Sequence, residues 1–585
     1  MCGIFAYIGD KETAGTLILE GLKSLEYRGY DSWGIVIKKT DGSTHVEKHI
    51  GRIGRASFPR FSSQIGIGHT RWATHGGVVE KNSHPHADCT GKILIVHNGI
   101  VENFEEIKRD LIKKGHRFKS DTDSEVIAHL VEEKSKHSTN SRKIIRDVFD
   151  SLKGMNAIIV FYPEKDCFYA IKNGSPIVFG KSKQETIIAS DSSAISPFTK
   201  KVYFLNDGEL LEIQAKKTSL FGENGKKKSF DYITLNFGME EGKLGAYPHF
   251  MIKEIHEQPK VLQNIINTQK KTITDLSKVI KHAYGTYFIG CGTAFYASLA
   301  GTYLFSKIAK RHVNASVGSE FSYLIDFLKK DSLVIALSQS GETIDIISSA
   351  KKIKEKGTKL LTITNTLGST LYRMADYKML LNAGPEKCVL ATKSFTSKIA
   401  VLNLLAHSLN GGFEKGAKEI KNAAGEVVKL IQSNTMKKLA QRLKNHRHIY
   451  IIGRGISYPT ALESALKIKE VSYIHAEGLA GGELKHGVIA LVEKGTPVIV
   501  YNPEDETYED TLSSAYEVKA RGAFTIGISS KSNPVYDEFI RVENCGNATV
   551  IPNVVVAQLL GYYLALSKKL DPDKPRNLAK SVTVK

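Results

Sequence analysis

The pattern of hydrophobic and polar positions divides the chain into two parts with different predicted structures. Up to about residue 240, short apolar runs such as residues 3–8 and 93–96 are separated by turn-forming residues, and residues 151–240 continue as short strands and turns. This pattern predicts antiparallel sheets. From about residue 250, helix-period segments alternate with short apolar strands such as residues 333–337. That alternation is typical of a parallel α/β sheet covered by helices.

The second part contains an internal repeat. Residues 287–294 (YFIGCGTA) and 450–457 (YIIGRGIS) both read as a strand, a glycine turn and a helix start, and 163 positions separate Gly290 from Gly453. This spacing predicts two similar domains in tandem. Neither copy has the third glycine of a GxGxxG motif, so neither predicts a dinucleotide site. We expect a first domain at residues 2–237, a linker at 238–250, α/β domains at 251–420 and 421–570, and a tail at 571–585.

The composition is that of a globular protein with several domains. The chain has 585 residues, of which 42% are hydrophobic. A chain of this length is too long to fold around a single hydrophobic core. We identify no apolar run of membrane-spanning length and no basic, apolar leader, and therefore expect a cytoplasmic protein with no membrane partner. Six cysteines without a CxxC pair argue against a disulfide framework and against a zinc site.

The net charge of +20 does not indicate nucleic-acid binding. The lysines are spread along helix-like surfaces, and the densest run, residues 226–228, lies in a loop-like stretch without interleaved aromatic residues. We expect no nucleic-acid partner, because the charge is explained by solvated helix faces and by attraction of anionic substrates.

The first residues carry candidate nucleophilic chemistry. Removal of Met1, which a small following residue permits, would make Cys2 the terminal residue. Its thiol could then attack while its own α-amine, with a reference pKa of roughly 8, accepts the proton. The simpler interpretation is that Cys2 is a small apolar residue at the start of a strand.

Polar motifs farther along offer groups that suit an amino-acid ligand. Arg71 could bind an α-carboxylate through two parallel hydrogen bonds, and Asp123 could pair with an α-ammonium group. Asn98 with the backbone N–H of Gly99 could form an oxyanion hole.

Three further residues superficially suggest metal ligands: His84, His86 and Cys89. The proline between the two histidines and the lack of a fourth ligand fit a metal site poorly. We therefore interpret the histidines as hydrogen-bonded structural residues and predict no metal site.

These motifs occur together in the order found in class II glutamine amidotransferases. Residues 2–235 resemble their N-terminal-nucleophile glutaminase domain, an αββα sandwich, through Cys-Gly-Ile, RGYDS, GHTRWATHG, HPH, HNGI and TDSE. The resemblance implies that Cys2 is nucleophile and base and that Asn98 and Gly99 bind the oxyanion. It implies that glutamine is bound by Arg71, Trp72, Thr74, His75 and Asp123. Trp33 replaces a usual small residue, which we interpret as repacking.

In the second part, residues 338–343 (SQSGET) follow an apolar strand and precede a helix-like segment that begins near Ile344. Hydroxyls and backbone N–H groups at a helix start suit a phosphate ester, although such a loop can also be a simple turn. The spacing of a Walker loop is absent.

Two tandem domains of this kind resemble the sugar isomerase (SIS) fold, a doubly wound parallel sheet. With the glutaminase half and the C-terminal PRNLAKSVTV, they resemble the glutamine–fructose-6-phosphate aminotransferases over nearly the whole chain. The resemblance implies that sugar phosphate is bound by Thr293, Ser338, Gln339, Ser340, Thr343, Val389 and Ala579. It implies proton transfer by Lys467 and Glu470, ring opening by His486, and a Schiff base on Lys580.

From the residues alone, these roles have simpler alternatives. Lys467 and Glu470 are spaced i, i+3, which more often indicates a surface ion pair. His486 would otherwise be a loop histidine and Lys580 a solvated tail residue.

Two positions depart from the family pattern. Ala294 and Ala391 replace serines that are usual near the sugar. Each loss could remove a hydrogen bond of about 1 kcal/mol or let water substitute, so we expect weaker or rearranged sugar binding.

The resemblance implies conversion of fructose 6-phosphate and L-glutamine into glucosamine 6-phosphate and glutamate, with internal transfer of ammonia and no cofactor. This is the first step of hexosamine biosynthesis. A homodimer is expected if His486 acts across a subunit interface. Two alternatives stay open: an enzyme acting on another phosphosugar, and a non-catalytic sugar-phosphate sensor. The intact candidate catalytic residues argue against the sensor: Cys2, Glu470, His486 and Lys580. An amidotransferase acting on phosphoribosyl pyrophosphate is disfavoured, because SIS-like loops replace the acidic pyrophosphate site.

Overall fold

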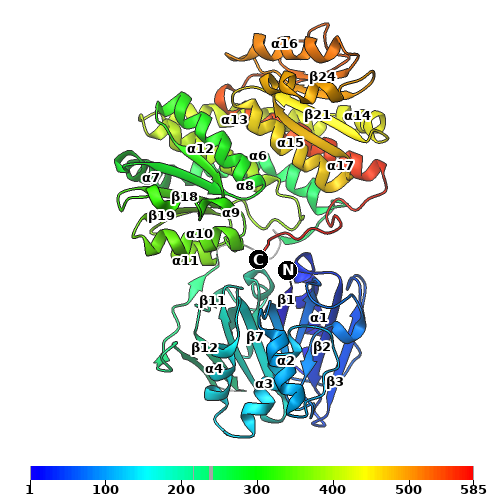
Figure 1. Ribbon diagram of the computed structural model, residues 1–585, viewed down its shortest axis with the longest axis vertical. Coiled ribbons are helices and arrows are strands. Elements are labelled where there is room, and N and C mark those ends of the chain that lie inside the picture. The colour runs from blue at the N-terminus through cyan, green and yellow to red at the C-terminus, as the bar shows by residue number, and fades with distance from the viewer. Residues whose placement is uncertain (1, 215–216, 236–241, 584–585) are drawn as a thin grey trace. The chain divides into compact units, whose positions relative to one another are not determined.

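The chain folds into two compact units in a computed structural model that describes residues 2–214, 217–235 and 242–583 (Figure 1). The first unit comprises Met1–Glu241 with Gly368–Thr370 and Ala579–Lys585, and the second comprises Gly242–Leu367 and Leu371–Leu578. Residues 238–241 of the predicted linker lie outside the described residues.

Two antiparallel sheets form the middle of the first unit, within the part of the chain that the structure describes. The eight-stranded sheet has the order β15 (Ile233–Thr234), β11 (Lys201–Phe204), β9 (Val178–Lys181), β10 (Glu185–Ala189), β1 (Gly3–Gly9), β4 (Ile65–Arg71), β2 (Ser32–Lys38) and β3 (Thr44–Ile50). The seven-stranded sheet has the order β14 (Lys227–Lys228), β13 (Lys217–Phe221), β12 (Leu210–Gln214), β8 (Cys167–Asn173), β7 (Asn156–Tyr162), β6 (Leu94–Gly99) and β5 (His86–Ala87).

Strand alternation explains why the two sheets stack. In β1, Ile4, Ala6 and Ile8 face the core between the sheets, whereas Phe5 and Tyr7 point to the opposite face and pack with helix α1 (Ala14–Leu25). Successive residues of a strand point to opposite sides, so a strand that is apolar at every position needs a partner layer on both faces. The sheet therefore lies between a second sheet and a helix.

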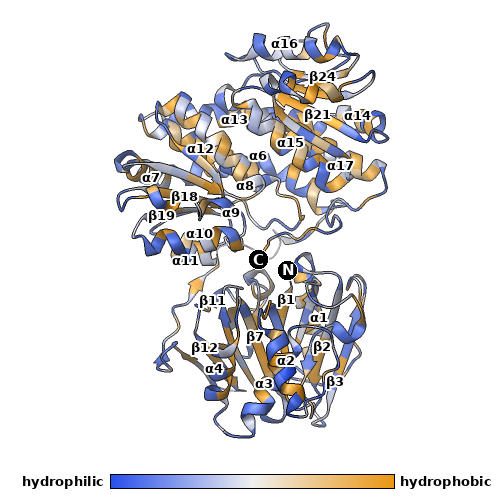
Figure 2. Ribbon diagram, viewed as in Figure 1, coloured by the Kyte–Doolittle hydropathy of each residue, from blue (hydrophilic) through white to orange (hydrophobic). Residues whose placement is uncertain are grey.

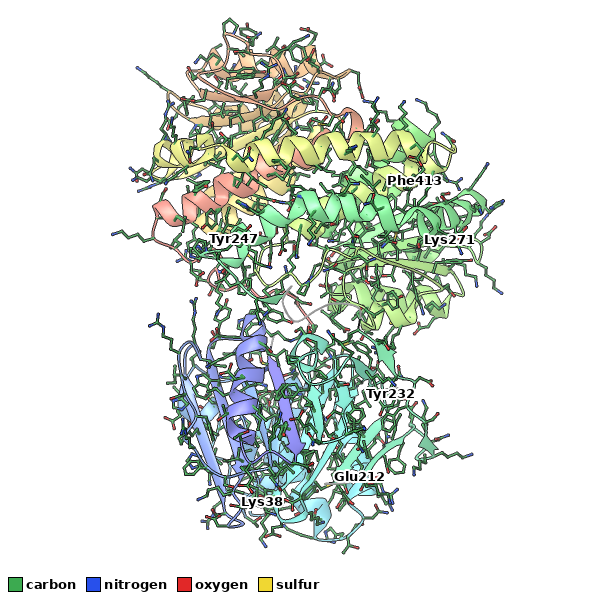
Figure 3. All side chains as sticks on the ribbon, turned by 180° about the vertical axis from the view of Figure 1, so that it is seen from behind. Lys38, Glu212, Tyr232, Tyr247, Lys271 and Phe413 are labelled. Atoms are coloured by element: carbon green, nitrogen blue, oxygen red, sulfur yellow. The ribbon has the colours of Figure 1, made fainter. Side chains whose placement is uncertain are left out.

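The second sheet is covered in the same way. In β7, Ala157 and Ile159 join the core between the sheets, and Ile158 and Val160 pack with the helical side. The unit contains α1, α2 (Phe104–Lys113), α3 (Glu125–Ser135), α4 (Ser141–Ser151) and α5 (Ser192–Ile195). The layers are helix, sheet, sheet, helix, which confirms the predicted αββα sandwich. At one end, Lys38 (labelled in Figure 3) pairs with Asp166 of the other sheet's β7–β8 turn at 2.8 Å.

The second unit contains two five-stranded sheets whose strands all pair in parallel. The first has the order β17 (Asn314–Val317), β16 (Thr286–Gly290), β18 (Leu333–Ser338), β19 (Lys359–Thr364) and β20 (Tyr377–Leu380). The second has the order β22 (His475–Ala480), β21 (His448–Gly453), β23 (Pro497–Tyr501), β24 (Phe524–Ser529) and β25 (Glu538–Arg541). When the five strands of each sheet are numbered in chain order, both sheets have the spatial order 2-1-3-4-5. This shared order confirms the predicted tandem repeat.

Helices cover these sheets, and several of them share one core. They are α6 (Phe250–Thr268), α7 (Lys270–His282), α8 (Thr293–Leu304), α9 (Gly318–Phe321), α10 (Ile344–Glu355), α11 (Thr370–Met374), α12 (Lys393–Ser408), α13 (Phe413–Gln432), α14 (Thr435–Leu443), α15 (Ser457–Ser472), α16 (Tyr508–Lys519) and α17 (Val550–Ser567). One hydrophobic cluster includes residues of α6, α12, α13, α15 and α17, and Figure 2 shows the hydrophobic residues concentrated in the interior strands and in helices such as α17. The predicted boundary between residues 420 and 421 falls inside α13, which begins at Phe413 (labelled in Figure 3).

Among the described residues, one helix is long and apolar enough to cross a membrane, which the sequence reasoning did not recognise. The helix is Gly546–Ser567, and 89% of its apolar 18-residue stretch is buried inside the unit. Burial on all sides is what an apolar core helix requires, and α17 packs against α13, α14 and α15.

Candidate active sites

The thiol of Cys2 lies at the start of β1, beside the residue that follows β4. The Trp72 N–H donates to Cys2 Sγ at 3.3 Å, and Sγ lies 3.7 Å from the Trp72 carbonyl oxygen. The side chain is half-buried, and burial raises the pKa of the thiol. A protonated thiol needs a base before it can attack a carbonyl. The α-amine that removal of Met1 would expose on Cys2 is the predicted base.

An amide donor faces Cys2 in a fixed orientation. Asn98 Nδ2 donates to the Cys2 carbonyl oxygen at 3.1 Å, and Arg28 Nε donates to the same oxygen at 3.3 Å. His69 Nε2 lies 3.1 Å from both Asn98 Oδ1 and the His97 carbonyl oxygen. Both oxygens accept, so Nε2 carries the proton, and burial lowers the pKa of His69 to about 3, which keeps the ring neutral. The Asn98 NH₂ group is therefore directed at Cys2, as an oxyanion donor requires.

Glycine is required at the end of β6. Gly99 has φ of +147°, and a Cβ there would lie 2.1 Å from the Met155 carbonyl oxygen. Two residues later, the Val101 N–H donates to Asp123 Oδ2 at 2.8 Å. The segment at the end of this strand thus carries Asn98 and Gly99 and holds the buried Asp123 carboxylate through Val101.

Arg71 is buried at the end of β4 and organises the following loop. Its guanidinium donates to the carbonyl oxygens of His75 (2.5 Å), Gly76 (2.9 Å) and Gly77 (3.2 Å). Burial lowers the pKa of Arg71, an effect opposed by nearby Cys2 and acidic side chains. In this structure Arg71 holds the loop, and its predicted contact with a substrate carboxylate stays a prediction.

The remaining predicted glutamine-binding residues lie on that loop. Trp72 and His75 are half-buried and Thr74 is exposed. The His75 ring packs edge-on against Phe104 with centroids 5.4 Å apart. The loop therefore borders the Cys2 thiol on one side and open solvent on the other.

The histidines of the HPH motif pack against each other and against His69. The His84 ring stacks on His69 (centroids 4.1 Å apart) and packs edge-on against His86 (4.4 Å). Burial lowers the pKa of both His84 and His86 well below the usual range, so both rings are neutral. Thr122 Oγ1 lies 3.1 Å from His86 Nε2. Cys89 does not join this group; its neighbours are different histidines.

In the second unit, the SQSGET loop connects β18 to α10 at the predicted residues. Ser338 Oγ accepts the Gly341 N–H at 3.0 Å and lies 3.2 Å from Thr343 Oγ1. Gly341 has φ of +65°, which permits the turn. Ser338 is buried, and Gln339, Ser340 and Thr343 are half-buried. The hydroxyls gather around one turn at a helix start, an arrangement suited to an anion.

Strand order places a second predicted ligand beside this loop. In doubly wound sheets, ligands bind outside the carboxyl ends of the two strands between which the chain order reverses. Here those strands are β16 and β18. Thr293 begins the helix that follows β16, and Ser338 ends β18. Both residues therefore border the same crevice.

The repeated glycines have a steric cause. A Cβ on Gly290 would lie 2.5 Å from the Ala294 carbonyl carbon, and one on Gly453 would lie 2.4 Å from the Ser457 carbonyl oxygen. Each glycine thus lets the strand end approach the first turn of its helix. The next glycine of each junction, two residues later, has φ of +53° in both copies.

Helix α15 directs three charged residues to one buried point. Lys467 Nζ lies 2.6 Å from Glu470 Oε2 and 3.5 Å from Glu463 Oε1, and it donates to Thr293 Oγ1 at 3.1 Å. The side chains of Lys467 and Glu463 are at most 1% exposed, and that of Glu470 is 20% exposed. This burial excludes the surface ion pair that the i, i+3 spacing alone favoured.

The charges of this group follow from burial and mutual attraction. Burial raises the pKa of Glu463 to about 7 against the opposing effect of Lys467, and Glu470 adds to the rise. Burial would lower the pKa of Lys467, but the two carboxylates outweigh it and raise that pKa. Lys467 is therefore an ammonium group at neutral pH and acts as a donor. Glu470, the partly exposed member, is the group able to accept a substrate proton.

The other predicted sugar-site residues are less closely connected. The buried Val389 donates its N–H to the Asp573 carbonyl oxygen at 3.1 Å. His486 is exposed at the end of the 3₁₀ segment Gly481–His486. Ala579 and Lys580 are half-buried and group with the first unit. The roles of these residues stay predictions.

Comparison with known proteins identifies both units. A protein-family model described as SIS domain matches residues 280–408 and 442–568. A second model, described as glutamine amidotransferase domain, matches residues 69–197. Proteins named glutamine–fructose-6-phosphate aminotransferase (isomerizing) from Thermococcus kodakarensis and Pyrococcus horikoshii are each 42% identical, over 100% of this chain and 100% of theirs. The chain belongs to the glutamine–fructose-6-phosphate aminotransferase family. Among solved structures, the C-terminal domain of the Francisella tularensis glucosamine-fructose-6-phosphate aminotransferase is 31% identical with a TM-score of 0.52, covering 57% of this chain and 100% of that one.

Membership of the aminotransferase family confirms the predicted fold class, with one glutaminase domain and two SIS domains. Sequence reasoning assigned no role to Glu463 or His69. Glu463 could have been found from its i, i+4 spacing to Lys467. The orienting role of His69 depends on a contact to Asn98, 29 positions away, that the sequence does not indicate.

Proposed function

We propose that this chain converts D-fructose 6-phosphate and L-glutamine into D-glucosamine 6-phosphate and L-glutamate. The observation that carries the proposal is the buried Lys467–Glu470 pair, joined through Thr293 to the crevice that the SQSGET loop borders. A proton-transfer pair beside an anion-binding turn suits isomerisation of a sugar phosphate. Full-length identity of 42% to proteins named for this reaction supports it.

The first unit supplies ammonia in this proposal. The Cys2 thiol attacks the glutamine side-chain amide carbon while its α-amine takes the thiol proton. The Asn98 amide and Gly99 N–H stabilise the resulting oxyanion. Ammonia leaves with a proton from the amine, and water then hydrolyses the thioester to glutamate.

The second unit consumes the ammonia. Ser338, Gln339, Ser340 and Thr343 bind the phosphate, and the ring opens with help from His486. Lys580 forms a Schiff base at C2 of the open chain with loss of water, and ammonia then adds at C2 and displaces the lysine amine, leaving an imine. Glu470 then takes a proton from C1 and returns it at C2, which yields the aldose amine.

The remaining parts of the sugar site complete this proposal. Lys580 forms a Schiff base with the sugar carbonyl, and the Val389 loop and Ala579 line the sugar. Ammonia passes internally, because in water it would be protonated and lost. We also propose a cytoplasmic homodimer in which His486 reaches the neighbouring subunit's site, because this histidine is exposed within its own chain.

The test is glucosamine 6-phosphate formation from both substrates, with glutamate release measured when each is omitted. Wild type should form product, Cys2→Ala should release no glutamate, and Lys580→Ala should release glutamate without aminosugar. Glutamate release by wild type without aminosugar would redirect the search to another phosphosugar. Tight sugar-phosphate binding without turnover of either substrate would instead support a sensor.

Subunit mixing tests the dimer proposal. Glu470→Gln and His486→Ala variants should each lack aminosugar synthesis. If His486 acts across the interface, mixed dimers of the two variants regain one complete site and part of the activity. A mixture that stays inactive, although exchange of labelled subunits is demonstrated, contradicts the shared site.

A further inference from the structure

Four potential metal ligands converge in the first unit, away from the thiol of Cys2. Cys89 lies in the turn between β5 and β6, His116 follows α2, and His129 and Glu132 are one turn apart on α3. Their ligand atoms all lie within 4.8 Å of one another. Cys89 is exposed, both histidines are buried, and Glu132 is half-buried. Sequence reasoning grouped Cys89 with His84 and His86 and so found no fourth ligand.

The separations fit a single tetrahedral ion. Cys89 Sγ lies 3.7 Å from His116 Nδ1 and 3.5 Å from His129 Nδ1, and the two Nδ1 atoms are 3.3 Å apart. Glu132 Oε2 lies 3.1 Å from His116 Nδ1 and 3.3 Å from His129 Nδ1. Ligands held at zinc bond lengths of about 2.0–2.3 Å in a tetrahedron stand about 3.3–3.8 Å from one another. Five of the six separations lie within or close to this range, and the sixth, between Cys89 Sγ and the Glu132 carboxylate, is within 4.8 Å.

The far side of each imidazole ring faces a carboxylate. His116 Nε2 lies 3.1 Å from Glu133 Oε2, and His129 Nε2 faces Glu125 Oε1 at 3.6 Å. Acceptors on that side favour the proton on Nε2, which leaves a lone pair on each Nδ1 directed at the common centre. Metal-bound histidines show this outer carboxylate contact. Glu125 is itself held by the backbone N–H groups of Lys119 (2.8 Å) and Ser120 (2.6 Å).

The sulfur also has a ligand-like setting. The Arg117 N–H donates to Cys89 Sγ at 3.4 Å, so the sulfur is held in place beside the two imidazoles. Two imidazole lone pairs, a carboxylate and a sulfur that meet at one point repel one another unless a cation or shared protons lie between them. A proton on His116 Nδ1 would give the nitrogen and oxygen atoms their hydrogen bonds. It would not explain why the Cys89 sulfur lies at the fourth corner of the tetrahedron.

We propose that Cys89, His116, His129 and Glu132 bind one Zn²⁺ ion as a structural site. Thiolate and imidazole ligands select zinc over magnesium or calcium, which prefer oxygen. Four protein ligands leave no open position, so the ion does not activate water. It ties the β5–β6 turn and the segment after α2 to helix α3, directly after Asp123. Because the unfolded chain lacks this geometry, the ion stabilises the folded unit.

Metal analysis of the full-length protein, purified without a histidine tag and kept reduced, tests the site. Wild type should retain about one zinc per chain after desalting, or regain it when the chelator-treated protein is given ZnCl₂. Cys89→Ser and His129→Ala should reduce zinc to near zero. Cys291→Ser and His137→Ala are matched controls outside the cluster and should keep the metal. Cys89 is exposed, so its replacement by serine does not disturb a core.

Cobalt substitution gives a second readout. Co²⁺ bound at this site should show the visible absorption of a tetrahedral ion and a thiolate charge-transfer band that Cys89→Ser removes. Chelation should lower the unfolding temperature of wild type but not of Cys89→Ser. Failure of the reduced, folded wild type to bind added Zn²⁺ would overturn the proposal, as would equal zinc in wild type and both cluster variants.

Discussion

The ammonium group of Lys467 lies 2.6 Å from the carboxylate of Glu470, and the lysine side chain is 1% exposed. Removing one member of a buried ion pair leaves the other charge without compensation, at a cost of about 3–5 kcal/mol. A buried pair of this kind is expected to serve a function. The contact of Lys467 with Thr293, at the edge of the ligand crevice, links the pair to the sugar site.

Glu470→Gln should abolish aminosugar synthesis and leave glutamine hydrolysis in place. The amide keeps the size of the side chain but cannot accept a proton, and a positioned general base contributes roughly 10²–10⁴-fold to rate. Product formation and glutamate release, measured on the same samples, separate the two units. Glu493→Gln, an exposed change in the same domain, is the control. Undiminished synthesis by Glu470→Gln would assign the proton transfer to another group.

Glu463→Gln should change how stability depends on pH. The pKa of Glu463 is about 7 in the folded protein, against an ordinary value of 4.5, so the folded chain binds more protons between these values. Wild type should lose stability as the pH rises from 4.5 to 7, by at most about 1.4 kcal/mol per pH unit from this group. Denaturant unfolding across this window should show a flatter profile for Glu463→Gln. Parallel profiles for the two proteins would show that Glu463 keeps an ordinary pKa.

Asn98→Ala should slow glutamine hydrolysis by about 10²–10³-fold, the loss seen when one oxyanion donor is removed. The substitution lies in the first unit, so the affinity of the second unit for fructose 6-phosphate should stay at the wild-type value. Glutamate release and fructose 6-phosphate binding by the same samples are the measurements. Loss of both would point to a folding defect instead.

Gly290→Ala should weaken sugar-phosphate binding and destabilise the second unit. The added Cβ would lie 2.5 Å from the Ala294 carbonyl carbon and would displace the start of α8, which carries Thr293. Gly425→Ala is the matched control, because nothing lies within 4 Å of its Cβ position in helix α13. Alanine there should stabilise by about 0.5–1 kcal/mol. Unfolding temperature and KM for fructose 6-phosphate distinguish the two variants; similar values would refute the steric account.

The fold was predictable because local patterns and global layers agree. The alternation in β1 and the repeated YFIGCG and YIIGRG junctions each specify an element and its neighbours. The boundary expected at residue 420 stays a prediction; helix α13 crosses that position without interruption, because the two domains share one core. Helix α17 was missed because tyrosines, asparagine and glutamine interrupt its apolar residues.

The candidate sites were predictable only where a motif is local. The HNG and SQSGET sequences carry their own geometry, since the turn and the donors are neighbours in the chain. Burial cannot be predicted from local sequence. The i, i+3 spacing of Lys467 and Glu470 fits a surface ion pair equally well, and only the packing of α15 against α8 shows that the pair is buried. Cys89 shows the converse error, because its neighbours in sequence, His84 and His86, are not its neighbours in space.

The two SIS domains have the same strand order, but the loops at their corresponding strand ends differ. The first domain places SQSGET after β18, whereas the second places Asn502, Pro503 and the acidic residues 504–506 after β23. Proline has no N–H to donate, and carboxylates do not attract a phosphate. The second domain thus repeats the strand order of the first but not its phosphate-binding loop. Each chain should therefore bind a single sugar phosphate.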